Sequence, residues 1–255
     1  MNIEENIILI AVRLKSKRLK KKALLPLANL PLIIQLVNRL KMCKFVNKIV
    51  ICTSTNSEDD ELEKLSIENN ISYYRGSELN LLKRFLDASE KFNANTIVRV
   101  TGDNPLTDPE VIDKMLNEHV SNNYDYTYCD KIPIGTRSEI ISREVLKFCD
   151  KNVNNPNNSE YMTWMLNRPD IFKVHNLKLK AQQNFDVDLN FTVDDKNEYL
   201  NIKLLYDKFG SNYFSLSEIL NFLNENKQIL KKFIDKDKKS KFIVDTNFKF
   251  DKWLI

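Results

Sequence analysis

The residues near the amino terminus that could do chemistry are basic, and they directly follow a strongly apolar run. Residues 7–12 are six consecutive apolar residues, which predicts a strand buried on both faces. Residues 13–22 then carry a dense set of arginines and lysines and lead toward a helix predicted at about residues 31–41. In an open α/β sheet, the loop after the first strand is a ligand-binding position. The pattern therefore predicts a strongly anionic ligand, such as a nucleoside triphosphate.

The same basic segment has a plainer explanation, because clustered lysines usually form a solvated surface. Here, however, the run adjoins a hydrophobic strand, and some of its residues stand at defined offsets. These residues are Arg13, Ser16, Arg18 and Lys22. We favour phosphate binding, and the solvated surface stays as the alternative.

A second group of chemically loaded residues lies at 99–109. A strand predicted at residues 96–100 ends just before Gly102 and Asp103, which places a carboxylate at the same edge of the sheet as the basic segment. Asp103 could hold Mg²⁺ against triphosphate oxygens, while the alternative is a simple turn, since Gly, Asp, Asn and Pro all form turns. Asp108 precedes a proline and is predicted to cap the next helix.

A third acid, Asp194, ends a strand predicted within residues 191–194. Together with Asp103 it would supply the two carboxylates that Mg²⁺ commonly takes when substrate phosphates complete its coordination shell. From the residues alone, Asp194 could equally cap the helix that begins at Asp195.

These motifs resemble the cytidylyltransferases that activate acidic sugars, most of all the branch typified by spore coat polysaccharide biosynthesis protein F. Related enzymes activate 3-deoxy-manno-octulosonate and acylneuraminates. The first motif is similar to the family's amino-terminal signature over Ala11-x-Arg13-x-x-Ser16-x-Arg18-Leu19-x-x-Lys22. The family has Gly, Pro and Gly where this chain has Lys15, Lys20 and Lys21. Because glycine lets backbone amides approach phosphate, we expect this loop to bind more through side-chain charge.

The resemblance implies roles for particular residues. Residues 99–109 match the family's Arg-x-Thr-Gly-Asp-x-Pro-Leu-x-Asp-Pro segment, and residues 191–199 match its Leu-Thr-Val-Asp segment. The implied Mg²⁺ ligands are Asp103 and Asp194, and the implied catalytic residues are Arg13, Lys22 and Asp103. Residues 75–78 resemble a family segment near the nucleotide base. The implied nucleotide-binding residues are Ala11, Arg13, Ser16, Arg18, Lys22, Arg75, Thr101 and Gly102.

The part of the chain that would hold the acceptor matches less well. Residues 133–139 keep the Pro, Gly and Glu of the family's Pro-x-Gly-x-Asp-x-Glu pattern, but Arg137 replaces the acid and could recognise a carboxylate or phosphate. Residues 160–163 resemble the family's Glu-His-Val-Thr, with Tyr and Met in the middle. The implied substrate-binding residues are Arg137, Glu139 and Glu160.

Strands and helices alternate along the chain, and this order must position the motifs. The other predicted strands lie at residues 48–54, 71–76 and 124–129. Three further helices are predicted: one begins after Asn56 or Ser57 as N-cap, one spans about 79–92, and one spans about 109–120. Such alternation predicts a three-layer α/β/α fold with a mainly parallel, mixed sheet. The resemblance implies a nucleotide-diphospho-sugar transferase (GT-A-like) fold. We expect one domain over residues 1–255, with 210–255 as a helical and tail extension.

Composition argues against several classes of protein. With 42% hydrophobic residues, 255 residues can bury a large core, and no apolar run is long enough to span a membrane. A net charge of +4 from 39 basic and 35 acidic residues argues against nucleic-acid binding. Four scattered cysteines indicate reduced thiols, and two histidines argue against a zinc site. With no signal-peptide pattern at the amino terminus, we expect a cytoplasmic protein.

We therefore expect a nucleotidyltransferase that uses CTP and Mg²⁺, transfers CMP to an acidic sugar or a related surface-glycan precursor, and releases pyrophosphate. Its partners would be CTP and a small-molecule acceptor, and a homodimer is one possible assembly. One alternative is a GT-A-type glycosyltransferase with a nucleotide-sugar donor, for which residues 186–188 offer an Asp-Val-Asp motif. Another is a non-catalytic nucleotide-binding homologue, which the missing loop glycines favour.

Overall fold

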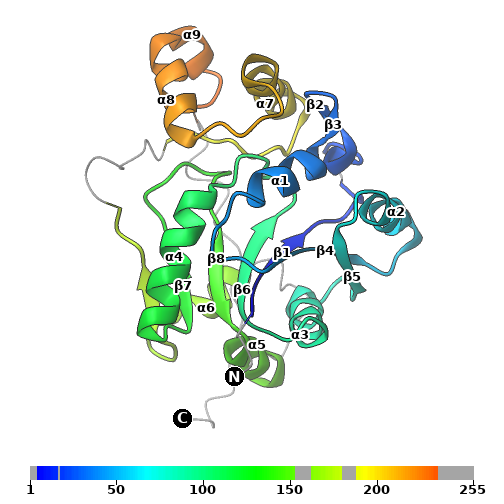
Figure 1. Ribbon diagram of the computed structural model, residues 1–255, viewed down its shortest axis with the longest axis vertical. Coiled ribbons are helices and arrows are strands. Elements are labelled where there is room, and N and C mark those ends of the chain that lie inside the picture. Colours follow the sequence, from blue (N-terminus) through cyan, green and yellow to red (C-terminus); the bar gives the residue numbers. More distant parts are fainter. Residues whose placement is uncertain (1–4, 17, 153–161, 180–187, 235–255) are drawn as a thin grey trace.

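A seven-stranded sheet forms the centre of the computed structural model, which describes residues 5–16, 18–152, 162–179 and 188–234 (Figure 1). Its strand order is β5-β4-β1-β6-β8-β7-β9. The strands are β1 (Glu5–Ala11), β4 (Lys48–Ser54), β5 (Ser72–Gly76), β6 (Ala94–Thr101), β7 (Tyr126–Tyr128), β8 (Glu139–Ser142) and β9 (Val174–Asn176). β8 pairs antiparallel with both neighbours, and the other pairings are parallel. The predicted mainly parallel, mixed sheet is confirmed.

The central strand β1 is apolar on both faces because helices cover both faces. Ile8 and Ile10 pack into the core under α1 (Leu32–Leu40), α2 (Asp60–Glu68) and α4 (Pro109–Asn122). Ile7 and Leu9 point the other way, into the core under α3 (Leu81–Lys91), α5 (Arg143–Asn152) and α6 (Met162–Leu166). All four side chains are fully buried. The result is the predicted three-layer α/β/α arrangement.

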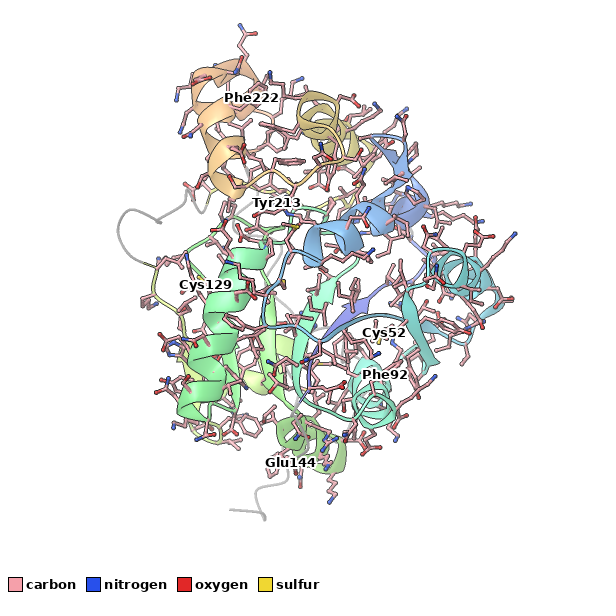
Figure 2. The ribbon with its side chains drawn as sticks, in the orientation of Figure 1. Cys52, Phe92, Cys129, Glu144, Tyr213 and Phe222 are labelled. Carbon is pink, nitrogen blue, oxygen red and sulfur yellow. The ribbon has the colours of Figure 1, made fainter. Side chains whose placement is uncertain are left out.

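A third apolar cluster lies at one end of the molecule, at the top of Figure 1, where α7 (Lys196–Phe209), α8 (Leu216–Glu225) and α9 (Lys227–Leu230) gather. The cluster also contains Leu27 of the small hairpin formed by β2 (Pro26–Leu27) and β3 (Leu30–Pro31). Phe222 marks α8 in Figure 2 and packs against Phe209 of α7. The described part of the expected extension thus shares one core with α7.

Two local expectations are wrong, both for tertiary reasons. Neither Asn56 nor Ser57 caps a helix with its side chain; a 3₁₀ turn, η2 (Ser57–Asp59), comes first, and α2 begins at Asp60. Asp59 turns inward instead and is buried. Residues 191–194 form no strand of the sheet, and the described residues just before them make only isolated bridges, at Leu189 and Asn190. By contrast, Asp108 caps α4 as predicted, through the backbone amides of two residues in the first turn.

Several elements were absent from the sequence-based expectations. These include the short β2–β3 hairpin and, after residue 138, the elements β8, β9, α5 and α6. Within the described ranges, no helix combines the length and the apolar character needed to cross a membrane.

Candidate active site

A pocket of about 510 Å³ opens at the carboxyl edge of β1 and β6. It brings together most of the residues that the sequence analysis singled out, although they come from three distant parts of the chain. The predicted residues that line it are Ala11, Arg13, Ser16, Arg18, Lys22, Thr101, Gly102, Asp103 and Asp194.

The first two motifs meet because β1 and β6 are paired in parallel and end together. Ala11 stands opposite Thr101 in the sheet, and the Gly102 amide donates to the Ala11 carbonyl at 2.9 Å. A Cβ at position 102 would lie 2.6 Å from Cβ of Val12, closer than side chains tolerate. Glycine is therefore required here for the approach of two chain segments, and Asp103 follows it directly into the pocket.

Lys22 joins the two predicted metal ligands. Its Nζ donates to Asp103 at 2.7 Å and to Asp194 at 2.9 Å, and only 15% of the lysine side chain is exposed. Burial on its own would lower the pKa of the Lys22 ammonium, but the charges of Asp103 and Asp194 and the hydrogen bonds to them raise that pKa above its ordinary value. The three side chains form one half-buried cluster held together by ion pairs.

The backbone and α7 hold Asp194 in place. The Val193 amide donates to the Asp103 carbonyl at 2.9 Å, which ties the second motif to the third. The Glu198 carboxylate accepts from the Asp194 amide at 2.7 Å and completes a capping box with Asp195 at the start of α7. Arg18 also reaches Asp194, at 2.8 Å. Burial tends to raise the pKa of Asp194, but Lys22 and Arg18 hold it below its ordinary value.

The two carboxylates suit a divalent metal that prefers oxygen. Both oxygens already lie within 2.9 Å of one cationic centre, the Lys22 ammonium. Mg²⁺ takes one or two protein carboxylates and completes its shell with phosphate oxygens and water. The described residues contain no cluster of three or more His, Cys, Asp or Glu side chains that could hold a metal. The two carboxylates thus fit a metal whose remaining ligands are phosphate oxygens and water.

The basic segment keeps its shape without the family's glycines. Lys21 adopts a left-handed backbone conformation (φ 51°), where glycine is normally favoured. Its ammonium pairs with Glu61 at 2.5 Å, and Lys15 pairs with Glu78 at 3.2 Å. Arg13 donates to the Glu78 carbonyl at 3.1 Å. Acids from neighbouring elements therefore surround the outside of the segment.

Three predicted residues that the structure describes, Arg75, Arg137 and Glu139, do not line this pocket. Arg75 lies between Glu63 and Asp60, each 2.6 Å away, and ties β5 to α2. The Arg137 guanidinium donates to the Ile132 carbonyl at 2.9 Å. Glu139 is buried beside the pocket, where it pairs with Arg99 and accepts from the Tyr126 hydroxyl. The predicted substrate-binding residue Glu160 lies outside the described residues, as does the first acid of the Asp-Val-Asp motif at 186–188.

The pocket also contains two arginines that the sequence analysis did not single out. Arg99 alternates with Thr101 along β6, so the period of a strand already placed both on one face. Arg84 is only 2% exposed and stands on the apolar face of α3, three residues after Leu81. Burial lowers the pKa of Arg84 to about 10. A basic residue inside a helical apolar stripe was the signal that could have found it.

Comparisons with known proteins identify the family of this chain. A family model described as cytidylyltransferase matches residues 7–238. The spore coat polysaccharide biosynthesis protein SpsF of Bacillus subtilis is 34% identical over 226 residues, which span 86% of this chain and 93% of that protein. The structure of a cytidylyltransferase from Leptospira borgpetersenii matches with a TM-score of 0.83 at 27% identity, over 89% of this chain and 97% of that one.

A more distant structure shares the fold. CMP:2-keto-3-deoxy-manno-octonic acid synthetase, solved as a complex with CTP, matches with a TM-score of 0.64 at 14% identity. The match covers 80% of this chain and 99% of that one. The family model spans most of the chain, and the relatives are similar over nearly their whole length. This chain belongs to the cytidylyltransferase family.

Proposed function

We propose that this protein transfers CMP from CTP to an acidic sugar or a related surface-glycan precursor. The observation that carries the proposal is the meeting of Lys22, Asp103 and Asp194 in a basic pocket at the carboxyl edge of the sheet. The acceptor class is supported by similarity to a protein named for spore coat polysaccharide biosynthesis. The fold of a sugar-acid synthetase that binds CTP is consistent with it.

The reaction needs positioning and charge neutralisation more than a covalent nucleophile. An acceptor oxygen attacks the α-phosphorus of CTP, the bond from that phosphorus to the bridging oxygen breaks, and pyrophosphate leaves with the bonding electrons. Arg13, Arg18 and Lys22 supply positive charge around the triphosphate. Each pocket cation lowers the cost of the charge that develops on the leaving group.

The cytidylyltransferase family is generally metal-dependent, and the pocket contains the groups that such a metal needs. Asp103 and Asp194 would hold it, and we propose Mg²⁺ because both ligands are hard carboxylate oxygens. When bound, the metal would neutralise phosphate charge beside the reacting phosphorus. A homodimer and a cytoplasmic location remain predictions.

The test is a pyrophosphate-release assay with each of the four nucleoside triphosphates and a panel of acidic and neutral sugars, in Mg²⁺ and in EDTA. We expect release only with CTP, an acidic acceptor and metal, and a CMP-sugar product detected by mass spectrometry. A glycosyltransferase would consume a nucleotide-sugar without release of pyrophosphate. Tight CTP binding without turnover across the panel would indicate a non-catalytic homologue.

A further inference from the structure

A buried carboxylate outside the pocket contacts the backbone of the basic segment. Asp59 is 2% exposed and does not line the pocket. Its Oδ1 accepts the Leu14 amide at 2.7 Å. Its Oδ2 accepts the Ser54 amide at 3.2 Å and the Ser54 hydroxyl at 2.5 Å. One side chain thus links the first turn of the basic segment to the end of β4.

The contact continues through the backbone to Lys22. The amide of Leu14 donates to Asp59, and the carbonyl of Leu14 accepts a hydrogen bond from the Lys21 amide at 3.3 Å. This hydrogen bond closes residues 14–21 into a loop, and Lys22 follows immediately with its ammonium between Asp103 and Asp194. Two hydrogen bonds, from Leu14 to Asp59 and from Lys21 to Leu14, therefore connect Asp59 to the residue that precedes Lys22.

The basic segment needs such an anchor for two reasons. Residues 13–22 carry seven arginines and lysines, whose mutual repulsion favours an open loop. Lys21 also keeps a left-handed φ of 51°, a conformation that is unfavourable for a residue other than glycine. The ion pairs of Lys15 and Lys21 are more than half exposed on the lysine side, and pairs of that kind contribute little. Buried hydrogen bonds to a charged acceptor are the strong ones.

We propose that Asp59 is the positioning residue of the triphosphate-binding loop, acting through the Leu14 backbone rather than by contact with substrate. The proposal rests on the proposed function, because it gives the anchored loop its role in CTP binding. In this proposal, the buried Asp59 side chain keeps the loop that is closed by the hydrogen bond between Leu14 and Lys21 in its shape. Without Asp59, the pocket cations would keep their charge but lose their fixed positions.

The test compares Asp59→Asn with Asp60→Asn. Asp60 is the next residue, its side chain is 63% exposed, and it pairs with Arg75 away from the pocket. In Asp59→Asn, one of the two acceptor oxygens becomes an NH₂ group, which cannot accept from the Leu14 amide or the Ser54 amide that it then faces. Because the basic segment is rich in trypsin sites, its opening can be measured by trypsin cleavage without nucleotide. CTP affinity is measured by calorimetry, and KM and kcat are measured separately.

For Asp59→Asn, we expect trypsin cleavage within residues 13–22 to be about tenfold faster, with a similar loss of CTP affinity and a larger change in KM than in kcat. Asp60→Asn should behave as wild type. Ser54→Ala, which removes one donor to Asp59, should give a smaller effect in the same direction. If Asp59→Asn does not fold, Ser54→Ala tests the proposal in its place.

Two results would overturn the proposal. One is equal cleavage of the two Asp→Asn variants within the segment. The other is faster cleavage along the whole chain together with a lower melting temperature, which would show general destabilisation. Faster cleavage of the segment alone, in a protein whose wild type does not bind CTP, would overturn the proposed function and leave the anchoring role in place.

Discussion

At the centre of the pocket, one ammonium and two carboxylates neutralise one another only in part. Lys22 lies within 2.9 Å of both acids, and Arg18 adds a second positive charge beside Asp194. The raised pKa of Lys22 and the lowered pKa of Asp194 have one cause, since each charge stabilises the other. A ligand that enters this cluster must bring both negative charge for Lys22 and positive charge for the acids. A nucleoside triphosphate with a divalent metal brings both the negative and the positive charge.

The first prediction follows from that cluster. Replacing Asp103 or Asp194 with Asn keeps the shape of the side chain but removes the charge that holds a metal. We expect kcat to fall at least about 100-fold in each variant, while the melting temperature stays near wild type. Asp108→Asn is the matched control, because asparagine caps a helix as well as aspartate does. Full activity in both pocket variants would contradict the assignment.

The second prediction compares basic residues that line the pocket with basic residues that face solvent. Arg13 and Lys22 line the pocket, whereas Lys20 is exposed and Lys21 pairs with Glu61. We expect CTP affinity to fall at least about tenfold for Arg13→Ala and Lys22→Ala, and less than about threefold for Lys20→Ala and Lys21→Ala. Calorimetry at low and physiological salt measures both the losses and their screening. Equal, small losses at all four positions would show that the segment is only a solvated surface.

Among the elements, the four long strands of the first half of the chain were predictable because each carries its own pattern. β1, β4 and β6 contain apolar runs, and β5 contains two adjacent tyrosines. Amphipathic helices separate these four strands, and the observed bounds of the strands lie within two residues of the predicted ones. β8 spans only Glu139–Ser142, and it is buried between the preceding strand β7 and β6, which lies much earlier in the sequence. A strand that short has too few residues to show a period.

The burial of the Asp59 side chain also could not be predicted from local sequence. Residues 58–61 are four acids in a row, and local pattern assigns all of them to the start of a helix. Only the packed position of Leu14 and Ser54 selects one of these carboxylates for burial. The pocket residues, in contrast, could be predicted because the ends of parallel strands bring their motifs to one edge.

A loop between elements supports Asp194 and yields the third prediction. Gly135 has a φ of +83°, and a Cβ there would lie 2.4 Å from the backbone of Phe191 and Thr192. Gly135→Ala should therefore cost about 3 kcal/mol or more and shift the segment that carries Asp194. Gly210→Ala is the control, because Gly210 has the same φ sign (+82°) and nothing within 4 Å.

Urea unfolding measures the stabilities of these two variants, and kcat is measured at a temperature where both are folded. We expect Gly135→Ala alone to lose activity there, since Gly210→Ala carries backbone strain without a clash. Similar activity in the two variants would show that the loop around Gly135 does not position Asp194.

Across the whole molecule, the pocket depends on packing that lies far from it. Residues of the basic segment follow β1, Asp103 follows β6, and Asp194 precedes α7, whose core is shared with the β2–β3 hairpin. Tyr199 of α7 donates to the Pro26 carbonyl of that hairpin at 2.7 Å. Any condition that loosens the helix layers therefore reaches the site, and acid is one such condition.

His119 makes the fold sensitive to acid. It is 3% exposed on α4, and its Nδ1 lies 2.9 Å from the Thr127 hydroxyl on β7. Burial, assisted by the charge of His175, lowers the pKa of His119 from 6.5 to about 4. The folded state therefore favours neutral imidazole. The stability that this provides is complete above pH 6.5 and is lost as the pH falls toward 4, where the unfolded chain binds the proton first.

The last prediction is the size of that loss. A shift from 6.5 to about 4 corresponds to about 3 kcal/mol, so wild type should lose that much more unfolding free energy between pH 7.5 and pH 4 than His119→Gln does. Urea unfolding at several pH values measures both curves, and subtracting one from the other removes the titration of carboxylates common to both proteins. The two curves should separate below pH 6.5, because only wild type must keep a buried imidazole neutral against rising proton activity. Parallel curves would show that His119 is protonated in the fold at no cost, and that the contact between α4 and β7 does not set the acid limit of the molecule.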